Sequence, residues 1–76
     1  MNAAHLLAII GSRLKRRRQS LGISRDEVAA RVGKGNELIQ RLEEGTLHDL
    51  DLMTLQAVCE SLDFPIAKVF ASTEIS

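Results

Sequence analysis

The stretch ISRDEVAARVGKGNELIQRLEEG, from Ile23 to Gly45, predicts two short helices joined by a turn at Gly33. Ser24 and Glu27 have the spacing of a capping box, in which each side chain bonds the other's free backbone N–H. Glycine favours the left-handed conformation of a tight turn or a helix stop, which suits Gly33 and Gly45. Two helices joined in this way form a helix-turn-helix unit.

The second of these helices, Asn36 to Glu44, decides what the unit can bind. In many helix-turn-helix units the second helix enters the major groove of DNA. Here that helix carries three acidic side chains, Glu37, Glu43 and Glu44, which would repel phosphate. The sequence therefore predicts the architecture more directly than it predicts the ligand.

Length and composition predict one small helical domain. A chain of 76 residues supports a single thin core, and 45% apolar residues with one proline argue against disorder. The single cysteine, Cys59, cannot form an internal disulfide. No stretch approaches the roughly 20 apolar residues of a membrane helix, and the start MNAAHLLAIIG lacks the basic region of a secretory signal. We expect a cytoplasmic protein without membrane contact.

The net charge of zero conceals an asymmetry between the two halves of the chain. Residues 1–41 contain nine basic and three acidic side chains, a net charge of +6. Residues 42–76 contain one basic and seven acidic side chains, a net charge of −6. Such a molecule can orient itself on a polyanion, although the basic run Arg13 to Arg18 is equally compatible with a solvated helix face.

Apolar periodicity and helix-start signals predict about five helices. The first runs from about His5 to Ser20, Asp51 caps the fourth after a loop from Thr46 to Leu50, and Pro65 begins a short fifth. The residues expected to face the core are Ile10, Leu14 and Leu21 in the first helix, Val28, Ala29 and Val32 in the second, Ile39, Leu42 and part of Leu38 in the third, Leu52, Leu55, Val58, Cys59 and Leu62 in the fourth, and Ile66, Val69 and Phe70 in the fifth.

Several short motifs extend this pattern over most of the chain. They are Ile10-Gly11-Ser12-Arg13-Leu14, Leu21-Gly22-Ile23-Ser24, Glu27-Val28-Ala29, Val32-Gly33, Ile39-Gln40-Arg41-Leu42-Glu43 with Gly45, Leu55 through Leu62, and Val69-Phe70. With them, the chain resembles the Cro/phage-repressor (XRE-type) family of helix-turn-helix DNA-binding regulators. The resemblance implies an all-α fold, a compact five-helix bundle in which helices two and three form the helix-turn-helix. Several positions depart from the family pattern. Gly35 replaces a usual Ser or Thr cap, Arg25 a frequent glutamine, Glu44 an often basic or polar residue, and Asp63 a frequent glycine.

The resemblance also implies double-stranded DNA as the partner and assigns contacts by position. Relatives place the start of helix two against the DNA backbone and the first half of helix three against base edges. The matching positions, with the turn and the loop after helix three, are Arg25, Lys34, Asn36, Glu37, Gln40, Arg41, Thr46 and His48. Asn36 and Gln40 have the chemistry to read adenine. Arg41 suits guanine or a phosphate, and Glu37 suits the amino group of cytosine.

Two charged residues have a structural role in domains that resemble this one. An arginine late in helix one pairs there with a glutamate near the end of helix three. The resemblance implies that Arg18 and Glu43 form this partly buried ion pair, so neither is expected to read DNA.

No residue pattern indicates an enzyme, a cofactor or a metal site. His5 and His48 lie in separate segments, and no Cys/His spacing fits zinc. Cys59 lies on the apolar stripe of the fourth helix, which favours a buried, inert thiol over a nucleophile or a metal ligand.

The chain divides into residues 1–9, an apolar extension of the first helix, residues 10–70, the DNA-binding domain, and residues 71–76, a short C-terminal tail. Leu6, Leu7, Ala8 and Ile9 make the extension unusually apolar. It either packs as an extra turn on Phe64 or Phe70, or joins the segment from Ile66 to Ile75 in a twofold homodimer interface. We expect the homodimer, because paired recognition helices about 34 Å apart match a palindrome.

The sequence thus predicts a sequence-specific transcriptional regulator, most simply a repressor that occupies a palindromic operator as a dimer and associates with the nucleoid. The alternative is a protein-interaction module on the same fold, such as an antitoxin-type partner or a protein that binds another repressor. The acidic residues of helix three and the negative C-terminal half favour that alternative.

Overall fold

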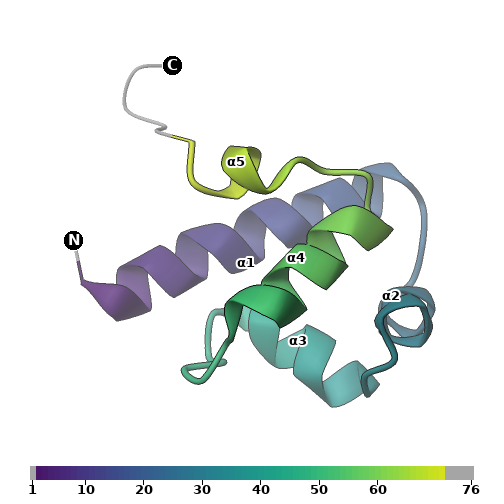
Figure 1. The fold of residues 1–76 in the computed structure, drawn as a ribbon, viewed down its shortest axis with the longest axis horizontal. Helices are drawn as coiled ribbons and strands as arrows, with labels where there is room; N and C mark the ends of the chain where they lie inside the picture. The colour runs from purple at the N-terminus through teal and green to yellow at the C-terminus, as the bar shows by residue number, and fades with distance from the viewer. Residues whose placement is uncertain (1, 72–76) are drawn as a thin grey trace.

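The computed structural model describes residues 2–71 and contains five α-helices and no strand in that range (Figure 1). They are α1 (Ala3–Ser20), α2 (Arg25–Val32), α3 (Asn36–Glu44), α4 (Leu52–Ser61) and α5 (Ile66–Val69). The all-α class and the five helices expected from the sequence are confirmed. α1 begins earlier than the predicted His5, because the Asn2 side chain caps it by accepting from the His5 backbone N–H at 2.8 Å.

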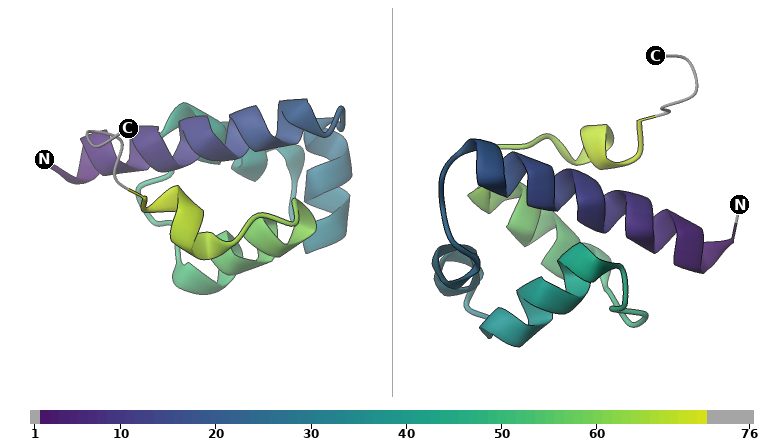
Figure 2. Two further views of the ribbon diagram at one scale, coloured as in Figure 1. Left: turned by 90° about the horizontal axis from the view of Figure 1, so that it is seen from above. Right: turned by 180° about the vertical axis from the view of Figure 1, so that it is seen from behind.

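The longest helix, α1, runs along one side of the molecule (Figure 1, Figure 2). It contacts α3 on one side and α5 on the other, while α2 contacts both α3 and α4. In Figure 1 α2 is seen nearly end-on, and α5 lies on the opposite side of the molecule from α3. The two helices of the predicted helix-turn-helix unit therefore lie together, away from α5.

Within residues 2–71, twelve apolar side chains are buried and pack in one cluster. They are Ile10, Leu14, Val28, Ala29, Ile39, Leu42, Leu47, Leu55, Val58, Cys59, Leu62 and Val69. All except Leu47 belong to the core expected from the sequence. Leu47 lies in the loop after α3, where no helical period marks a residue as buried. Val32, Leu38 and Ile66 pack against the cluster while partly exposed.

Three residues expected in the core are exposed instead. Leu21, Leu52 and Phe70 expose 41%, 68% and 51% of their surface. Leu21 and Phe70 are the C-caps of α1 and α5, and Leu52 is the first residue of α4. An apolar period predicts burial only where a neighbouring helix covers the turn. These residues lie at helix ends, where the chain changes direction and no such cover exists among the described residues.

The helix starts follow the predicted capping chemistry in part. The Ser24 hydroxyl accepts from the Glu27 backbone N–H at 3.1 Å, and the Asp51 carboxylate accepts from the Thr54 backbone N–H at 2.6 Å. The Glu27 carboxylate accepts from Arg31 Nε at 3.1 Å, an exposed pair one turn along α2. The structure thus shows the Ser24 half of the expected capping box. Gly35 caps α3 without a side-chain hydrogen bond, because glycine has no side chain that could accept one.

The two expected glycine stops are confirmed. Gly33 and Gly45 both adopt the left-handed conformation, with φ of 69° and 76°, and they end α2 and α3. Asp63 adopts a positive φ of 50° after α4, at the position where similar domains often have glycine. A left-handed conformation costs an ordinary L-residue about 1–2 kcal/mol, and Asp is among the residues that tolerate it best.

Gly11 allows α1 to approach α3 more closely than any other residue would. A Cβ atom built on Gly11 would lie 2.2 Å from the Leu42 carbonyl oxygen and 2.8 Å from the Glu43 carbonyl oxygen. Both atoms belong to the backbone of α3, so neither can move aside without displacing the helix.

We expect Gly11→Ala to push α1 and α3 apart and to lower the free energy of unfolding by about 1–3 kcal/mol, the usual cost of overpacking. Thermal melting measures the effect. Gly35→Ser is the matched glycine replacement, because nothing lies within 4 Å of the Gly35 Cβ position and the hydroxyl can cap α3. It should leave the melting temperature unchanged or slightly higher, and equal losses in both variants would contradict the close approach at Gly11.

Candidate nucleic-acid interface

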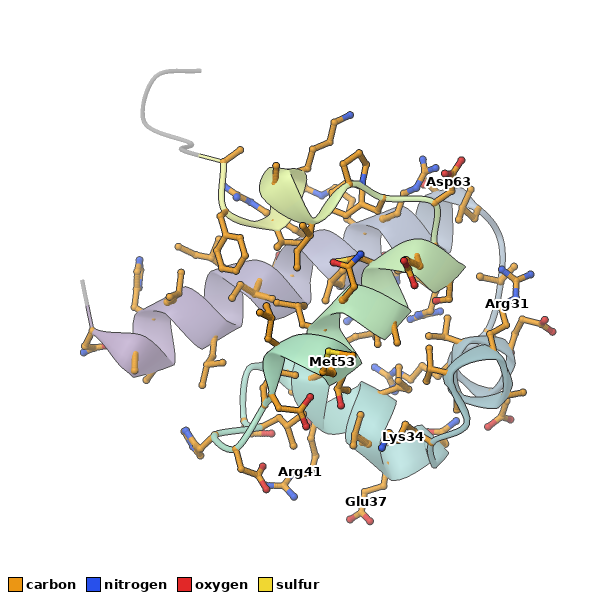
Figure 3. All side chains as sticks on the ribbon, viewed as in Figure 1. Arg31, Lys34, Glu37, Arg41, Met53 and Asp63 are labelled. Carbon is orange, nitrogen blue, oxygen red and sulfur yellow. The ribbon has the colours of Figure 1, made fainter. Side chains whose placement is uncertain are left out.

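The surface expected to contact DNA is formed by the start of α2, the turn at residues 33–35, the outer side of α3 and the loop before α4. Of the eight predicted contact residues, seven are exposed and Arg25 is half-buried. Figure 3 shows Lys34 at the turn, with Glu37 and Arg41 extending from α3 away from the rest of the molecule. The sequence prediction therefore selected accessible residues, and their contacts with DNA stay predictions.

The helical period of α3 separates this surface from the core. Ile39, Leu42 and Glu43 are buried, whereas the remaining polar residues of α3 are exposed on the outer side. One buried position is therefore acidic, and its environment determines how α3 is held.

The Glu43 carboxylate lies between two arginines from two other parts of the domain. Glu43 Oε2 accepts from Arg18 Nε at 2.6 Å, and Glu43 Oε1 accepts from Arg18 at 3.1 Å and from Arg25 Nε at 3.0 Å. The Glu43 side chain is 3% exposed and that of Arg18 is 11% exposed. Arg18 also donates to the Ile23 carbonyl at 2.9 Å, in the connection between α1 and α2. This is the pair that the resemblance implied, with Arg25 as a further member.

Burial raises the pKa of the Glu43 carboxyl, but hydrogen bonds and charges from Arg18 and Arg25 outweigh it. The pKa of Glu43 therefore lies below its ordinary value of 4.5. At neutral pH the group is ionised, and it joins α3 to α1 and α2 through charged hydrogen bonds.

Arg25 has a role that the sequence prediction missed. Its Nε donates to Glu43, and its side chain is 30% exposed. One side of the guanidinium group is thus committed to the scaffold, which leaves its terminal nitrogens to contact a phosphate. No sequence signal marks this pairing, because the two residues are 18 positions apart and meet only when α2 packs on α3.

The polar groups on the outer side of α3 are themselves hydrogen-bonded. Asn36 Nδ2 donates to the Asp26 carboxylate of α2, and Gln40 Nε2 donates to Glu44 Oε2 at 3.2 Å.

At the end of α3, the Arg41 guanidinium donates to the Thr46 carbonyl at 3.4 Å, and the Thr46 hydroxyl donates to the Arg41 carbonyl at 3.3 Å. Lys34 lies close enough to Asp51 that its charge helps the Thr54 hydrogen bonds to lower the pKa of the Asp51 carboxyl.

The basic run of α1 contributes to the fold rather than forming one solvated face. Arg13 donates to the carbonyls of Lys68 and Val69 at 3.2 and 3.0 Å. Arg17 donates to the carbonyls of Leu62 and Asp63 at 2.9 and 3.2 Å. The solvated-face interpretation of this run is therefore wrong for Arg13, Arg17 and Arg18, while Lys15 and Arg16 are exposed.

The described residues offer few groups for other chemistry. Burial, and to a lesser degree the charge of Glu60, raises the pKa of the buried Cys59 thiol, which keeps it protonated at neutral pH. Residues 2–71 contain no group of three or more His, Cys, Asp or Glu side chains able to hold a metal ion. In the same range, no helix combines the length and apolar character needed to cross a membrane.

Comparison with protein-family models identifies the family of this chain. A family model described as helix-turn-helix, of the Cro/C1 type, matches residues 14–69, which include the last part of α1 and all of α2 to α5. No curated protein matches the chain significantly.

Glu43→Gln should lower the free energy of unfolding by roughly 3–5 kcal/mol, because it leaves the partly buried Arg18 without a charged partner. The melting temperature should fall by more than about 10 °C in a domain of this size. The lowered pKa adds a pH dependence, since the contribution of ionised Glu43 is present above pH 4.5 and is lost as the pH falls through its folded-state pKa. The stability of the wild type should therefore decline more steeply in acid than that of Glu43→Gln.

Glu27→Gln is the matched control for this prediction. It removes the same charge from an exposed pair with Arg31, and such a pair contributes at most about 1 kcal/mol. A melting temperature of Glu43→Gln no lower than that of Glu27→Gln would contradict a supporting role for the buried pair.

Proposed function

We propose, since the chain belongs to the Cro/C1-type helix-turn-helix family, that it is a sequence-specific repressor of transcription with α3 in the major groove of its operator. Membership implies DNA binding and transcriptional regulation, and the family is not known for enzymes. The observation that carries the finer proposal is the accessible outer side of α3, presented by a scaffold that buries the remaining face of that helix. Occupancy of the operator would exclude polymerase, and the protein would act in the cytoplasm on the nucleoid.

Three cations near α3 are available for phosphates. Arg25 stands at the start of α2, Lys34 at the turn and Arg41 near the end of α3. Each phosphate neutralised by a protein cation contributes a slope of about −0.9 to the dependence of log affinity on log salt concentration. Three contacts predict a slope of about −2.7 for one protomer and about −5 for a dimer.

Thr46 and His48 supply uncharged contacts to the backbone from the loop after α3. Both are exposed, and the Thr46 hydroxyl is held by the Arg41 carbonyl. They add to affinity with little effect on its salt dependence, because hydrogen bonds to the backbone neutralise no phosphate.

Two exposed apolar residues support a homodimer. Leu6 and Phe70 are 37% and 51% exposed, near the two ends of the described chain. Part of the N-terminal extension has an internal role, since Ala8 lies against Gly45, where an added Cβ atom would come within 2.8 Å of the Ala8 Cα. The expected interface from Ile66 to Ile75 extends beyond the described residues, which end at residue 71.

A second function has one specific observation in its favour. Glu37 extends outward from the middle of the surface expected to meet DNA, and its charge opposes phosphate (Figure 3). A protein partner with a basic surface would accept that charge. Binding to DNA that falls with salt favours the regulator, whereas no binding to DNA at low salt favours the protein-interaction module.

Arg41→Ala and Lys34→Ala should each weaken DNA binding and make the salt slope of a dimer less negative by about 2, because each removes one phosphate contact per protomer. Titration of a selected operator fragment at several salt concentrations measures both quantities. Arg16→Ala is the matched control, since Arg16 is exposed on α1 outside the proposed interface. Wild-type affinity and slope in both Arg41→Ala and Lys34→Ala, with melting temperatures unchanged, would contradict the site.

Sedimentation should find the full chain dimeric at micromolar concentration, and a Leu6→Asp, Phe70→Asp double variant monomeric, because charges do not pack at an apolar interface. Leu52→Asp tests whether any exposed leucine has this effect, since Leu52 is 68% exposed at the start of α4. It should leave the dimer intact. A wild-type chain that is monomeric at this concentration would exclude the dimer.

A further inference from the structure

The outer side of α3 carries two amide side chains, and each donates its NH₂ group to a carboxylate. Asn36 Nδ2 donates to Asp26, which lies on α2, and Gln40 Nε2 donates to Glu44, one turn further along α3. Both carboxylates are exposed and belong to the surface proposed to meet DNA. They are therefore available to orient the amides when the groove is occupied.

A carboxylate determines which way an amide turns. An ionised carboxylate has no proton to donate and can only accept, whereas an amide has a donor end and an acceptor end. Beside Asp26, Asn36 must therefore turn its NH₂ group toward that carboxylate and its carbonyl oxygen away from it. The same reasoning turns the carbonyl oxygen of Gln40 away from Glu44.

Glu37 adds a third acceptor to the same surface. It is exposed, it stands directly after Asn36, and it extends from α3 away from the body of the molecule (Figure 3). As a carboxylate it accepts and does not donate. The groove-facing half of α3 thus presents three acceptor groups in succession, from Asn36, Glu37 and Gln40.

In the major groove, the hydrogen-bond donors on base edges are the N6 amino group of adenine and the N4 amino group of cytosine. Guanine presents only acceptors there, and thymine presents an acceptor and a methyl group. We propose, on the basis of the function proposed above, that α3 reads exocyclic amino groups. The bases contacted by Asn36, Glu37 and Gln40 are then adenine or cytosine, and Asp26 and Glu44 are the positioning residues that impose this preference.

Arg41 is the cationic donor on this part of α3, and it lies away from the bases that the proposal assigns to Asn36, Glu37 and Gln40. Its guanidinium group lies toward the end of the helix, where it donates to the Thr46 carbonyl. A cation there meets the DNA backbone more readily than the bases opposite the start of α3. The acceptor surface and the phosphate contacts are thus separated along the helix.

The test begins with selection of bound duplexes from a random library by the full wild-type chain. Asn36→Ala, Glu37→Ala and Gln40→Ala identify the base pair that each side chain reads, as the one whose preference is lost. Each identified pair is then replaced by two kinds of analogue. One lacks the exocyclic amino group, with purine in place of adenine or 2-pyrimidinone in place of cytosine. The other lacks the purine N7 acceptor, with a 7-deazapurine.

Loss of the amino group should weaken binding about tenfold or more at each of these pairs, as expected for a lost base contact. The 7-deazapurine should change affinity less than the amino deletion at the same pair. The opposite order, with the N7 deletion the more harmful, would overturn the proposal and leave DNA binding itself intact. If no duplex is enriched and no salt-dependent binding is found, the proposed function fails as well, so the two failures are distinguishable.

Asp26→Asn and Glu44→Gln test the positioning role. Each replaces a carboxylate with a group that both donates and accepts, so the partner amide is free to turn. At the pair read by Asn36, the amino-group deletion and the N7 deletion should weaken binding of Asp26→Asn to within about threefold of each other. At the pair read by Gln40, the two deletions should differ in Asp26→Asn as they do in the wild type. Glu44→Gln should do the reverse.

Glu27→Gln makes the same change of charge at an exposed carboxylate that binds Arg31 instead. Glu27→Gln should raise the affinity for duplexes of any sequence as much as the other two variants do. At the pairs read by Asn36 and Gln40, the two analogues should still differ in affinity as they do with the wild type. If the affinities for the two analogues differ in Asp26→Asn and Glu44→Gln as much as in the wild type, the positioning role is excluded. If the affinity difference between the two analogues becomes smaller in Glu27→Gln as well, charge rather than amide orientation determines the preference for amino groups.

Discussion

The rest of the domain depends on the buried carboxylate of Glu43. An ionised group at 3% exposure is costly unless it is fully paired, and both of its oxygens accept from arginines. Arg18 and Arg25 bring charge from α1 and α2 to the same point on α3, and Arg18 also holds the Ile23 carbonyl of the intervening connection. A change in the angle between any two of these helices would break a charged hydrogen bond in the interior. The Glu43 side chain therefore links the orientation of α3 to both α1 and α2.

Arginine serves the same purpose elsewhere in the domain. Arg13, Arg17 and Arg31 donate to backbone carbonyls at and beyond the ends of α4 and α5, the last of them to Ser61 at 2.8 Å. Carbonyls at the end of a helix lack partners within it, and a cation satisfies them while also opposing the negative end of the helix dipole. Much of the positive charge in the first half of the chain is thus used for internal assembly. The charge asymmetry of the sequence does not translate directly into a positive face for DNA.

This use of charge bears on how the domain would recognise DNA. With Arg25, Lys34 and Arg41 as the cations of the proposed interface, and with Glu37 and Glu44 on α3, phosphate attraction is modest. Specific contacts with base edges then contribute a larger share of affinity. Carboxylates that would be unfavourable beside phosphates become useful in the groove, because there they accept from amino groups and orient neighbouring amides. The acidic composition of α3 is consistent with recognition in which base contacts predominate.

Local features determined what the sequence alone could predict. The Ser24 and Asp51 caps, the Gly33 and Gly45 stops and the apolar period of α2, α3 and α4 depend on residues within about four positions of each other, so they could be read directly. The tertiary structure alone decided the burial of Leu47 and the exposure of Leu21, Leu52 and Phe70, because these depend on which helix covers which end. It also brought Arg25 to Glu43 and Asp26 to Asn36, across the turn between α2 and α3. Such contacts arise only when separate helices pack, and no local period specifies that packing.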